Sequence, residues 1–330
     1  MIRIPIMVGG EYKAIFETHE AMHFEEIVAF ILIEEFGDKK FLQQYAKRDV
    51  ISVGVGGGPF DEHPKAGSKR KEGECGATLV AKALEVDDDP GLKEILKLAL
   101  ISDLKGNSQP GDISSFINLM SRQSPKDPEK VIKWVKKAIR AKYKEQFHFH
   151  TVTREEFSHA AKVEFVKSGA GVVKMVVIRS DDEQASKFAR SAEGSEAAII
   201  IQKKTSGNVQ IYTAQKFGIN LDDVARMINL AEQQAGGRVF STDWEILSAE
   251  GTIPGGRWHY FPQGGMILNG SLTYPDVPAT KITLEQIERI VRIGVDPSLF
   301  PRHCLNSRHC LLKECDWHSW GLRRCQIRRR

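Results

Sequence analysis

Apolar and polar positions in the first 125 residues predict strands and helices in alternation. Residues 2–8 and 50–55 are short apolar runs of the kind found in strands. Residues 23–36 form a strongly apolar helix candidate that Gly37 ends, and residues 76–84 form a second candidate that begins with small side chains. Because strands that alternate with helices usually build a layered domain, we expect an α/β domain with a mostly parallel sheet over residues 1–125.

The pattern changes after residue 125. Pro125 and Pro128 precede a run with apolar side chains at helical spacing, which predicts a long helix over residues 129–146 inside a helical linker, residues 126–165. Residues 166–298 then combine strand-like and helix-like runs, and we expect a smaller α+β domain there. The strand-like runs are residues 172–179, 197–202 and 209–213, and the helix-like runs are residues 222–234 and 283–292.

The composition is that of an ordinary globular protein, with 41% hydrophobic and 27% charged residues in a chain of 330. No run reaches the roughly 18 consecutive apolar residues of a membrane helix, and the N-terminus lacks the pattern of a signal peptide. We therefore expect a cytoplasmic protein with no membrane partner. The oligomeric state is left open, and a homodimer is one form that we consider.

The net charge of +4 comes from the C-terminal tail, residues 299–330. Residues 302–330 alone carry a net charge of +6, so the rest of the chain is slightly acidic. The tail is rich in metal-ligating and aromatic side chains, but no standard zinc-ligand spacing is present. An irregular appendage is the simplest interpretation, and a zinc site or a nucleic-acid contact are the alternatives. The side chains in question are Cys304, His309, Cys310, Cys315, Trp317, His318, Trp320 and Cys325.

Three short segments carry side chains that suit metal chemistry. His19, His23 and Glu25 stand just before and within the first apolar helix, and imidazole and carboxylate groups are ligands for Mn²⁺, Fe²⁺ or Zn²⁺. The alternative is that the two histidines cap or pack the helix. Asp61 and His63 follow a glycine run at the end of the 50–55 strand, where α/β sheets place their sites. Asp103 ends a later apolar segment and has an alternative role as a turn residue.

Taken in order, these segments resemble the DHH phosphoesterase superfamily. The resemblance is closest to the branch of the melanocyte-proliferating-gene exonuclease, also described as a family of uncharacterised metal-dependent hydrolases. It rests on three motifs in the first 125 residues and more loosely on glycine-containing segments near the C-terminus. The motifs are Thr18-His19…His23-Phe24-Glu25-Glu26, Ile51-Ser52-Val53-Gly54 and Asp61-Glu62-His63, followed by Trp258-His259-Tyr260-Phe261, Gly264-Gly265 and Asn269-Gly270.

The resemblance implies a DHH-like N-terminal domain with a two-metal phosphoesterase site facing the second domain. The implied cofactor is a divalent metal, Mn²⁺ first, with Mg²⁺, Fe²⁺ or Zn²⁺ as alternatives, and the implied substrate is RNA, a short oligonucleotide or another phosphodiester. The implied metal ligands and catalytic residues are His19, His23, Glu25, Asp61, His63 and Asp103. The implied substrate contacts, whose alternatives are a solvated basic loop, a packed histidine and ordinary turn glycines, are Lys65, Lys69, Arg70, Lys71, His259, Gly264 and Gly265.

Three departures from the family pattern argue against full activity. Ser52 stands where a metal-ligand Asp is expected, Glu25 replaces a shorter Asp, and Glu62 replaces the first His of the D-H-H motif. Losing an anionic ligand weakens a site for hard cations, because their binding depends on the number of ligand charges. An active hydrolase, a site with one metal and a catalytically impaired binding or regulatory protein all agree with these residues. A plain nucleic-acid-binding module rests chiefly on the basic tail.

Overall fold

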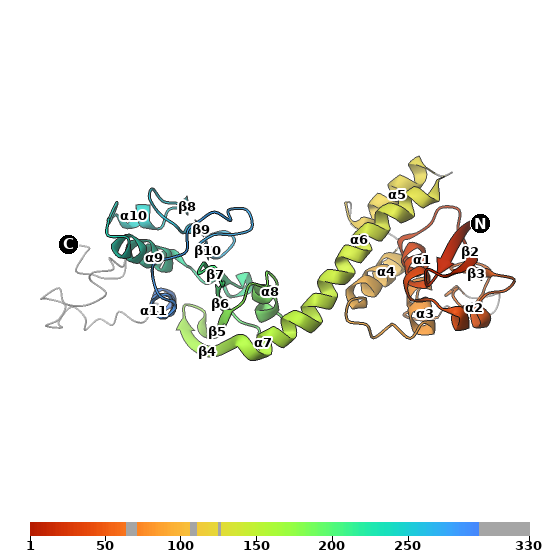
Figure 1. The fold of residues 1–330 in the computed structure, drawn as a ribbon, viewed down its shortest axis with the longest axis horizontal. Helices are drawn as coiled ribbons and strands as arrows, with labels where there is room; N and C mark the ends of the chain where they lie inside the picture. Colours follow the sequence, from red (N-terminus) through yellow and green to blue (C-terminus); the bar gives the residue numbers. More distant parts are fainter. Residues whose placement is uncertain (64–70, 106–110, 125–126, 297–330) are drawn as a thin grey trace, which may run out of the picture. The chain divides into compact units, whose positions relative to one another are not determined.

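The computed structural model describes residues 1–63, 71–105, 111–124 and 127–296. The chain divides into two compact units, Met1–Thr151 and Val152–Arg330 (Figure 1). Both units combine helices with a sheet, so the expected mixed α/β composition is confirmed. Within the described ranges, no helix has both the length and the apolar character needed to cross a membrane.

The sheet of the first unit is small and mixed. Its strands β1 (Ile2–Val8), β2 (Tyr12–Thr18) and β3 (Val50–Ser52) lie in that order. The β1 and β2 strands are antiparallel along seven residue pairs, whereas β2 and β3 are parallel along three. The expectation of a mostly parallel sheet was therefore wrong for this unit. The physical reason is the turn at Gly9 and Gly10, whose φ angles of 59° and 75° reverse the chain into a hairpin.

Helix α1 (Phe24–Phe36) is the central element of the first unit. All ten residues from position 24 to position 33 are buried, which explains why its sequence is apolar on every side. The helix packs on β1 and on several surrounding helices, and together they form one hydrophobic core (Figure 1). The other helices of this unit are α2 (Lys39–Tyr45), α3 (Gly76–Ala83), α4 (Lys93–Lys105), α5 (Ile113–Gln123) and α6 (Pro128–His148).

The long helix α6 begins at the proline predicted from the sequence. The Asp127 side chain accepts a hydrogen bond from the Lys130 N–H at 3.4 Å, and Pro128 occupies the first helical position, where its missing N–H costs nothing. A short π-helix, η1 (Phe149–Thr153), and then α7 (Arg154–Ala160) continue the helical run into the second unit.

The second unit is built on a seven-stranded sheet with the order β4-β5-β6-β7-β10-β9-β8. Neighbouring strands are antiparallel except for the parallel pair β5 and β6, which α8 (Ala185–Arg190) connects. This sheet has more strands than that of the first unit, although the sequence had suggested the smaller domain here. The strands are β4 (Ala161–Ser168), β5 (Gly171–Arg179), β6 (Ile199–Lys203), β7 (Val209–Thr213), β8 (Gly251–Thr252), β9 (His259–Phe261) and β10 (Met266–Leu268).

Helices cover both faces of the seven-stranded sheet. Helices α9 (Asp222–Ala235) and α11 (Leu284–Val295) pack on one face and bury the larger core cluster around Trp258. Helices α7 and α8 pack on the other face at β5 and β6. The short elements η2 (Gln215–Phe217) and α10 (Trp244–Leu247) lie in the connections.

Candidate metal site

A glycine-rich loop at the end of β3 brings the Asp61-Glu62-His63 segment back to the sheet. Gly54, Gly56 and Gly57 all have φ between 63° and 75°, a region that other residues rarely adopt. The loop closes where the Gly54 N–H donates to the Phe60 carbonyl at 2.9 Å. A single parallel bridge also joins Val53, just after β3, to Phe60, so the acidic segment starts beside the carboxyl end of this strand.

Glu26 joins the two histidines of the first cluster. His19 Nδ1 lies 2.5 Å from Glu26 Oε1, and the His23 backbone N–H donates to Glu26 Oε2 at 2.7 Å. The rings of His19 and His23 stack with their centroids 5.7 Å apart. Glu26 is fully buried at the start of α1, whereas His23 is exposed. The carboxylate therefore fixes the loop after β2 to the helix and leaves the imidazole rings near the surface.

Asp61 and Glu62 form a second group with His63. Asp61 Oδ2 accepts from the Gly57 N–H at 2.7 Å, and Asp61 Oδ1 accepts from the His63 N–H at 3.0 Å. His63 Nδ1 lies 3.2 Å from both Asp61 Oδ1 and Glu62 Oε1. Burial raises the pKa of Asp61, but the hydrogen bonds from Gly57 and His63 outweigh it and keep the pKa below its ordinary value. Asp61 is therefore held as an anion.

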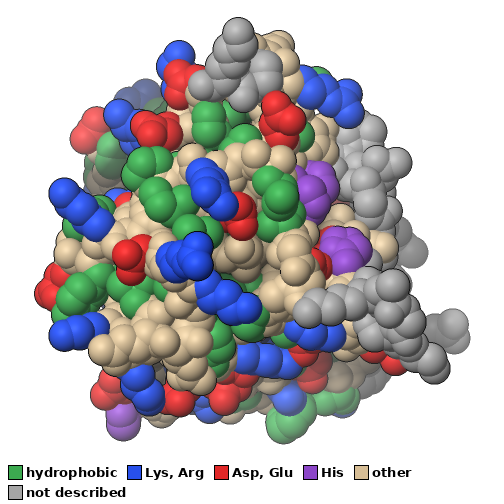
Figure 2. All heavy atoms as spheres, turned by 90° about the vertical axis from the view of Figure 1, so that its right-hand side faces the viewer, with side chains coloured by type: hydrophobic (Ala, Val, Ile, Leu, Met, Phe, Trp, Pro, Cys, Tyr) green, Lys and Arg blue, Asp and Glu red, His purple; other side chains and the backbone are tan. Residues whose placement is uncertain are grey.

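Each group offers three ligand atoms that lie within 4.8 Å of one another. The first group is His19, His23 and Glu26, and the second is Asp61, Glu62 and His63. The hydrogen bond with Glu26 raises the pKa of His19, and the charges of Asp61 and Glu62 raise it further. The two groups are therefore close enough to interact through their charges. Figure 2 shows histidine side chains grouped on the surface of this unit. These spacings suit a transition-metal ion with mixed nitrogen and oxygen ligands.

Glu25 is buried behind these groups and has an oxygen without a hydrogen bond. The residue is only 3% exposed, and its Oε2 atom has no hydrogen-bond partner. Burial and then the charges of Glu26, Glu62 and Asp103 raise the pKa of Glu25 well above its ordinary value. Gly76, at the start of α3, is needed beside it, since a Cβ there would lie 2.6 Å from Oε2. A buried carboxyl group with one unpaired oxygen is stable only with a proton or a cation close by.

The buried charged side chains of the first unit are all acidic among the residues that the structure describes. Among its described residues, the buried acidic side chains are four carboxylates, and no lysine or arginine is buried with them. Burial raises the pKa of Glu26 too, but its contacts with His19 and His23 bring it below the ordinary value. The negative charge of this region is thus offset only partly by protein groups. The four carboxylates are Glu25, Glu26, Asp61 and Glu62.

The Ser52 side chain is hydrogen-bonded to Glu17 of the neighbouring strand. Its hydroxyl donates to Glu17 Oε2 at 2.8 Å, and Glu17 also accepts from Arg3 Nε at 2.9 Å. Ser52 pairs with Glu17 across β2 and β3, and the flanking Ile51 and Val53 are both fully buried. Because side chains alternate along a strand, Ser52 and Glu17 share the face opposite to those two core residues. Glu17 is therefore a carboxylate in direct contact with this position.

The other residues proposed from the sequence are placed as follows. Asp103 lies on α4 and acts on Glu25 through its charge. The Lys71 ammonium donates to the Pro59 carbonyl at 2.8 Å, which anchors the exposed side chain to the glycine-rich loop. Lys65, Lys69 and Arg70 lie outside the described residues, as does the whole Cys- and His-containing tail.

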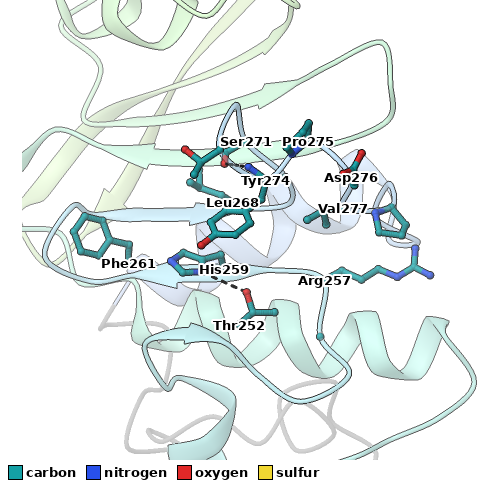
Figure 3. A pocket seen from close by; sticks show the side chains of 14 residues that line it. Thr252, Arg257, His259, Phe261, Leu268, Ser271, Tyr274, Pro275, Asp276 and Val277 are labelled. Carbon is teal, nitrogen blue, oxygen red and sulfur yellow. Dashed lines mark hydrogen bonds between the residues drawn. The ribbon is translucent and has the colours of Figure 1, made fainter.

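His259 lies in the second unit, in a pocket of about 800 Å³ (Figure 3). Its ring stacks on Tyr274 with a centroid distance of 6.3 Å, and its Nδ1 atom lies 3.3 Å from Thr252 Oγ1. Gly264 and Gly265 form the turn between β9 and β10. A Cβ on Gly265 would lie 2.2 Å from Thr213 Oγ1, and its φ is 61°, so the turn itself explains this glycine.

Sequence reasoning did not identify Glu26 and Glu62 as candidate ligands. The signal for Glu26 was its position three residues after His23, where a helix N3 side chain reaches back to the N-cap backbone. Glu25 instead points toward α3. For Glu62, the signal was its place between the candidates Asp61 and His63. The segment is neither a helix nor a strand, so no periodicity predicts where the Glu62 side chain points. Only the closed loop shows that all three consecutive side chains can gather around one point.

Comparisons with known proteins identify no relative. The chain matches no protein-family model, and neither curated proteins nor solved structures gave a match.

Proposed function

We propose that this protein is a metal-dependent phosphodiester hydrolase whose site is formed by the two histidine–carboxylate groups of the first unit. The observation that carries the proposal is the gathering of four buried carboxylates with three histidines and no buried basic side chain in the described part of that unit. Proteins keep such charge buried when a cation compensates it. The ordered motifs that resemble the DHH phosphoesterases support the assignment to phosphodiesters.

The donor set fits a divalent transition metal. Imidazole nitrogen and carboxylate oxygen together favour Mn²⁺, Fe²⁺ or Zn²⁺ over Ca²⁺, which binds oxygen only. The residues that would hold the metal are His19, His23, Glu26, Asp61, Glu62 and His63. The Oε2 atom of Glu25, which has no hydrogen-bond partner, lies behind them. When bound, divalent cations neutralise phosphoryl oxygens and lower the pKa of water, which is the chemistry of two-metal phosphoesterases.

The side chains have separate tasks in this proposal. Asp61 is kept anionic by two backbone N–H groups and is ready to bind a cation without first losing a proton. Glu26 orients His19 through Nδ1, which leaves Nε2 as the free ring nitrogen for a ligand. Lys71, anchored on the glycine-rich loop, is positioned to attract a substrate phosphate such as that of RNA or a short oligonucleotide.

The test combines metal content with turnover. The full chain is stripped with EDTA, reloaded with Mn²⁺ and examined by elemental analysis, and cleavage of bis(p-nitrophenyl) phosphate and a short RNA is then followed. We expect bound metal and Mn²⁺-dependent cleavage, and we expect both to be lost in Asp61→Asn. The matched control is Asp276→Asn in the second unit, which keeps both. A protein that neither binds metal nor cleaves these substrates contradicts the proposal.

A second candidate is a protein that binds metal without cutting. It is favoured by the bond between Ser52 and Glu17, because the position where the family carries a metal-ligand Asp holds a hydroxyl that is already committed to another residue. Metal binding that Asp61→Asn abolishes, with no cleavage by the wild-type chain under any metal, would support this candidate over the first.

A further inference from the structure

Strand β4 is one of the two edge strands of the seven-stranded sheet (Figure 1). It is eight residues long and pairs with β5 on one side, and within the described residues no strand pairs with its other side. Proteins usually shorten such an edge, cover it or load it with charge, because its free N–H and C=O groups attract other strands. Strand β4 carries three charged side chains, but it is long and, among the described residues, unpaired on one side, so a partner strand can add to this edge.

One face of this edge is unusually apolar. Phe165 is 70% exposed and Val163 is 45% exposed, and both lie on the same face of β4 because they are two residues apart. Val172 of β5, which pairs with Lys167, extends this face and is 67% exposed. The opposite face of β4 is covered, since Val166 is buried in the core that includes α11. Exposed apolar side chains grouped in this way mark an interaction surface.

The charges along β4 identify the partner. Lys162 and Glu164 flank Val163 on the same face of β4 as Val166, and within one subunit their side chains form an ion pair of 2.5 Å with each other. When two such strands run antiparallel around Val163, Lys162 of each chain faces Glu164 of the partner subunit. Opposite charges directly across a strand pair are stabilising, so the sequence of β4 is complementary to itself.

We propose that two copies of this chain associate by antiparallel pairing of their β4 strands. The two-fold axis passes through Val163, which faces the same valine of the partner subunit. Phe165 then faces Ala161 of the partner subunit, and the free backbone groups of both edges gain hydrogen bonds. The two sheets join into one continuous sheet. A contact of one strand per subunit is small, so the dimer dissociates at roughly micromolar concentration.

Sedimentation velocity of the full-length chain tests the proposal, over about 5 to about 200 µM because a small interface dissociates in this range. We expect the wild type to pass from monomer to dimer. In Lys162→Glu two glutamates oppose each other, and in Glu164→Lys two lysines do, so each variant alone shifts dimer formation to at least about ten-fold higher concentration. A one-to-one mixture of the two variants restores opposite charges and forms a heterodimer.

Two controls separate pairing from folding. Both residues also form ion pairs within the subunit, Lys162 with Glu164 and with Glu288, and Glu164 with Arg292, so each variant is first melted to show a folded chain. Lys133→Glu on α6 carries the same change in charge and leaves the dimer unaltered. A wild type that remains monomeric at the highest concentration overturns the proposal. So does a mixture of the two charge variants that stays monomeric.

Discussion

His19 and Glu26 are joined by a contact of 2.5 Å between Nδ1 and Oε1, although they lie seven positions apart in the chain. The contact ties the end of β2 to the first turn of α1. Because the same carboxylate accepts the His23 N–H, one buried side chain positions both histidines of the candidate site. The geometry of the site therefore depends on Glu26 more than on any histidine.

Glu26→Gln is expected to weaken Mn²⁺ binding by at least about ten-fold, because an amide neither carries the ligand charge nor orients His19 in the same way. Isothermal titration calorimetry with the metal-free chain measures the change. Glu20→Gln, an exposed position in the same loop, is the control and keeps wild-type affinity. Equal affinity in the two variants would remove Glu26 from the site.

Gly54→Ala is expected to disturb the Glu26 carboxylate, because Gly54 of the glycine-rich loop lies against it. A Cβ at Gly54 would lie 2.7 Å from Glu26 Oε1, and the φ of 69° is unfavourable for alanine. We expect a loss of about 1–3 kcal/mol in the free energy of unfolding, measured in urea. Gly58→Ala in the same loop has no heavy atom within 4 Å and no positive φ, and it should change stability by less than about 0.5 kcal/mol.

Regular periodicity made much of the fold predictable. The apolar run that begins at His23 became α1, and the strand predicted at residues 209–213 is β7 without any shift. Strand β2 escaped prediction even though Ala14, Phe16 and Thr18 alternate as buried residues, because the run from Tyr12 also carries two charged side chains. Without β2, the hairpin and the mixed character of the first sheet were not foreseeable.

The candidate site was predictable in composition but not in detail. Residue types located the two segments, since histidine and carboxylate side chains near a helix start and a strand end can serve as metal ligands. The choice between Glu25 and Glu26 required the rotation of α1, which the sequence does not give for a helix that is apolar all round. The closeness of Glu25 to Gly76 is a long-range packing contact, and no local pattern encodes it.

Trp258→Ala is expected to destabilise the second unit by about 3–5 kcal/mol, the usual cost of removing a large buried aromatic side chain. Trp258 is fully buried, and its Nε1–H donates to Glu232 Oε2 at 3.1 Å. Urea unfolding followed by circular dichroism gives the value. Trp134→Ala on α6 is the control, since that side chain is 43% exposed and its loss should cost less than about 1 kcal/mol.

Glu25→Gln is expected to stabilise the metal-free protein at neutral and alkaline pH. Burial, together with the charges of Glu26, Glu62 and Asp103, raises the pKa of Glu25 in the folded chain well above 4.5. The folded state therefore keeps a proton that the unfolded state releases, and stability falls as the pH rises from about 4.5 toward the folded pKa. Glutamine has no proton to lose.

The melting temperature of Glu25→Gln should thus exceed that of the wild type by more at about pH 8 than at about pH 5, both measured in EDTA. Saturating Mn²⁺ should reduce the difference, because a cation near the carboxyl group favours its charged form in the wild type. Glu20→Gln makes the same chemical change at an exposed position and should show no pH-dependent difference. A difference for Glu25→Gln that stays constant across this pH range would mean that Glu25 is ionised in the folded chain.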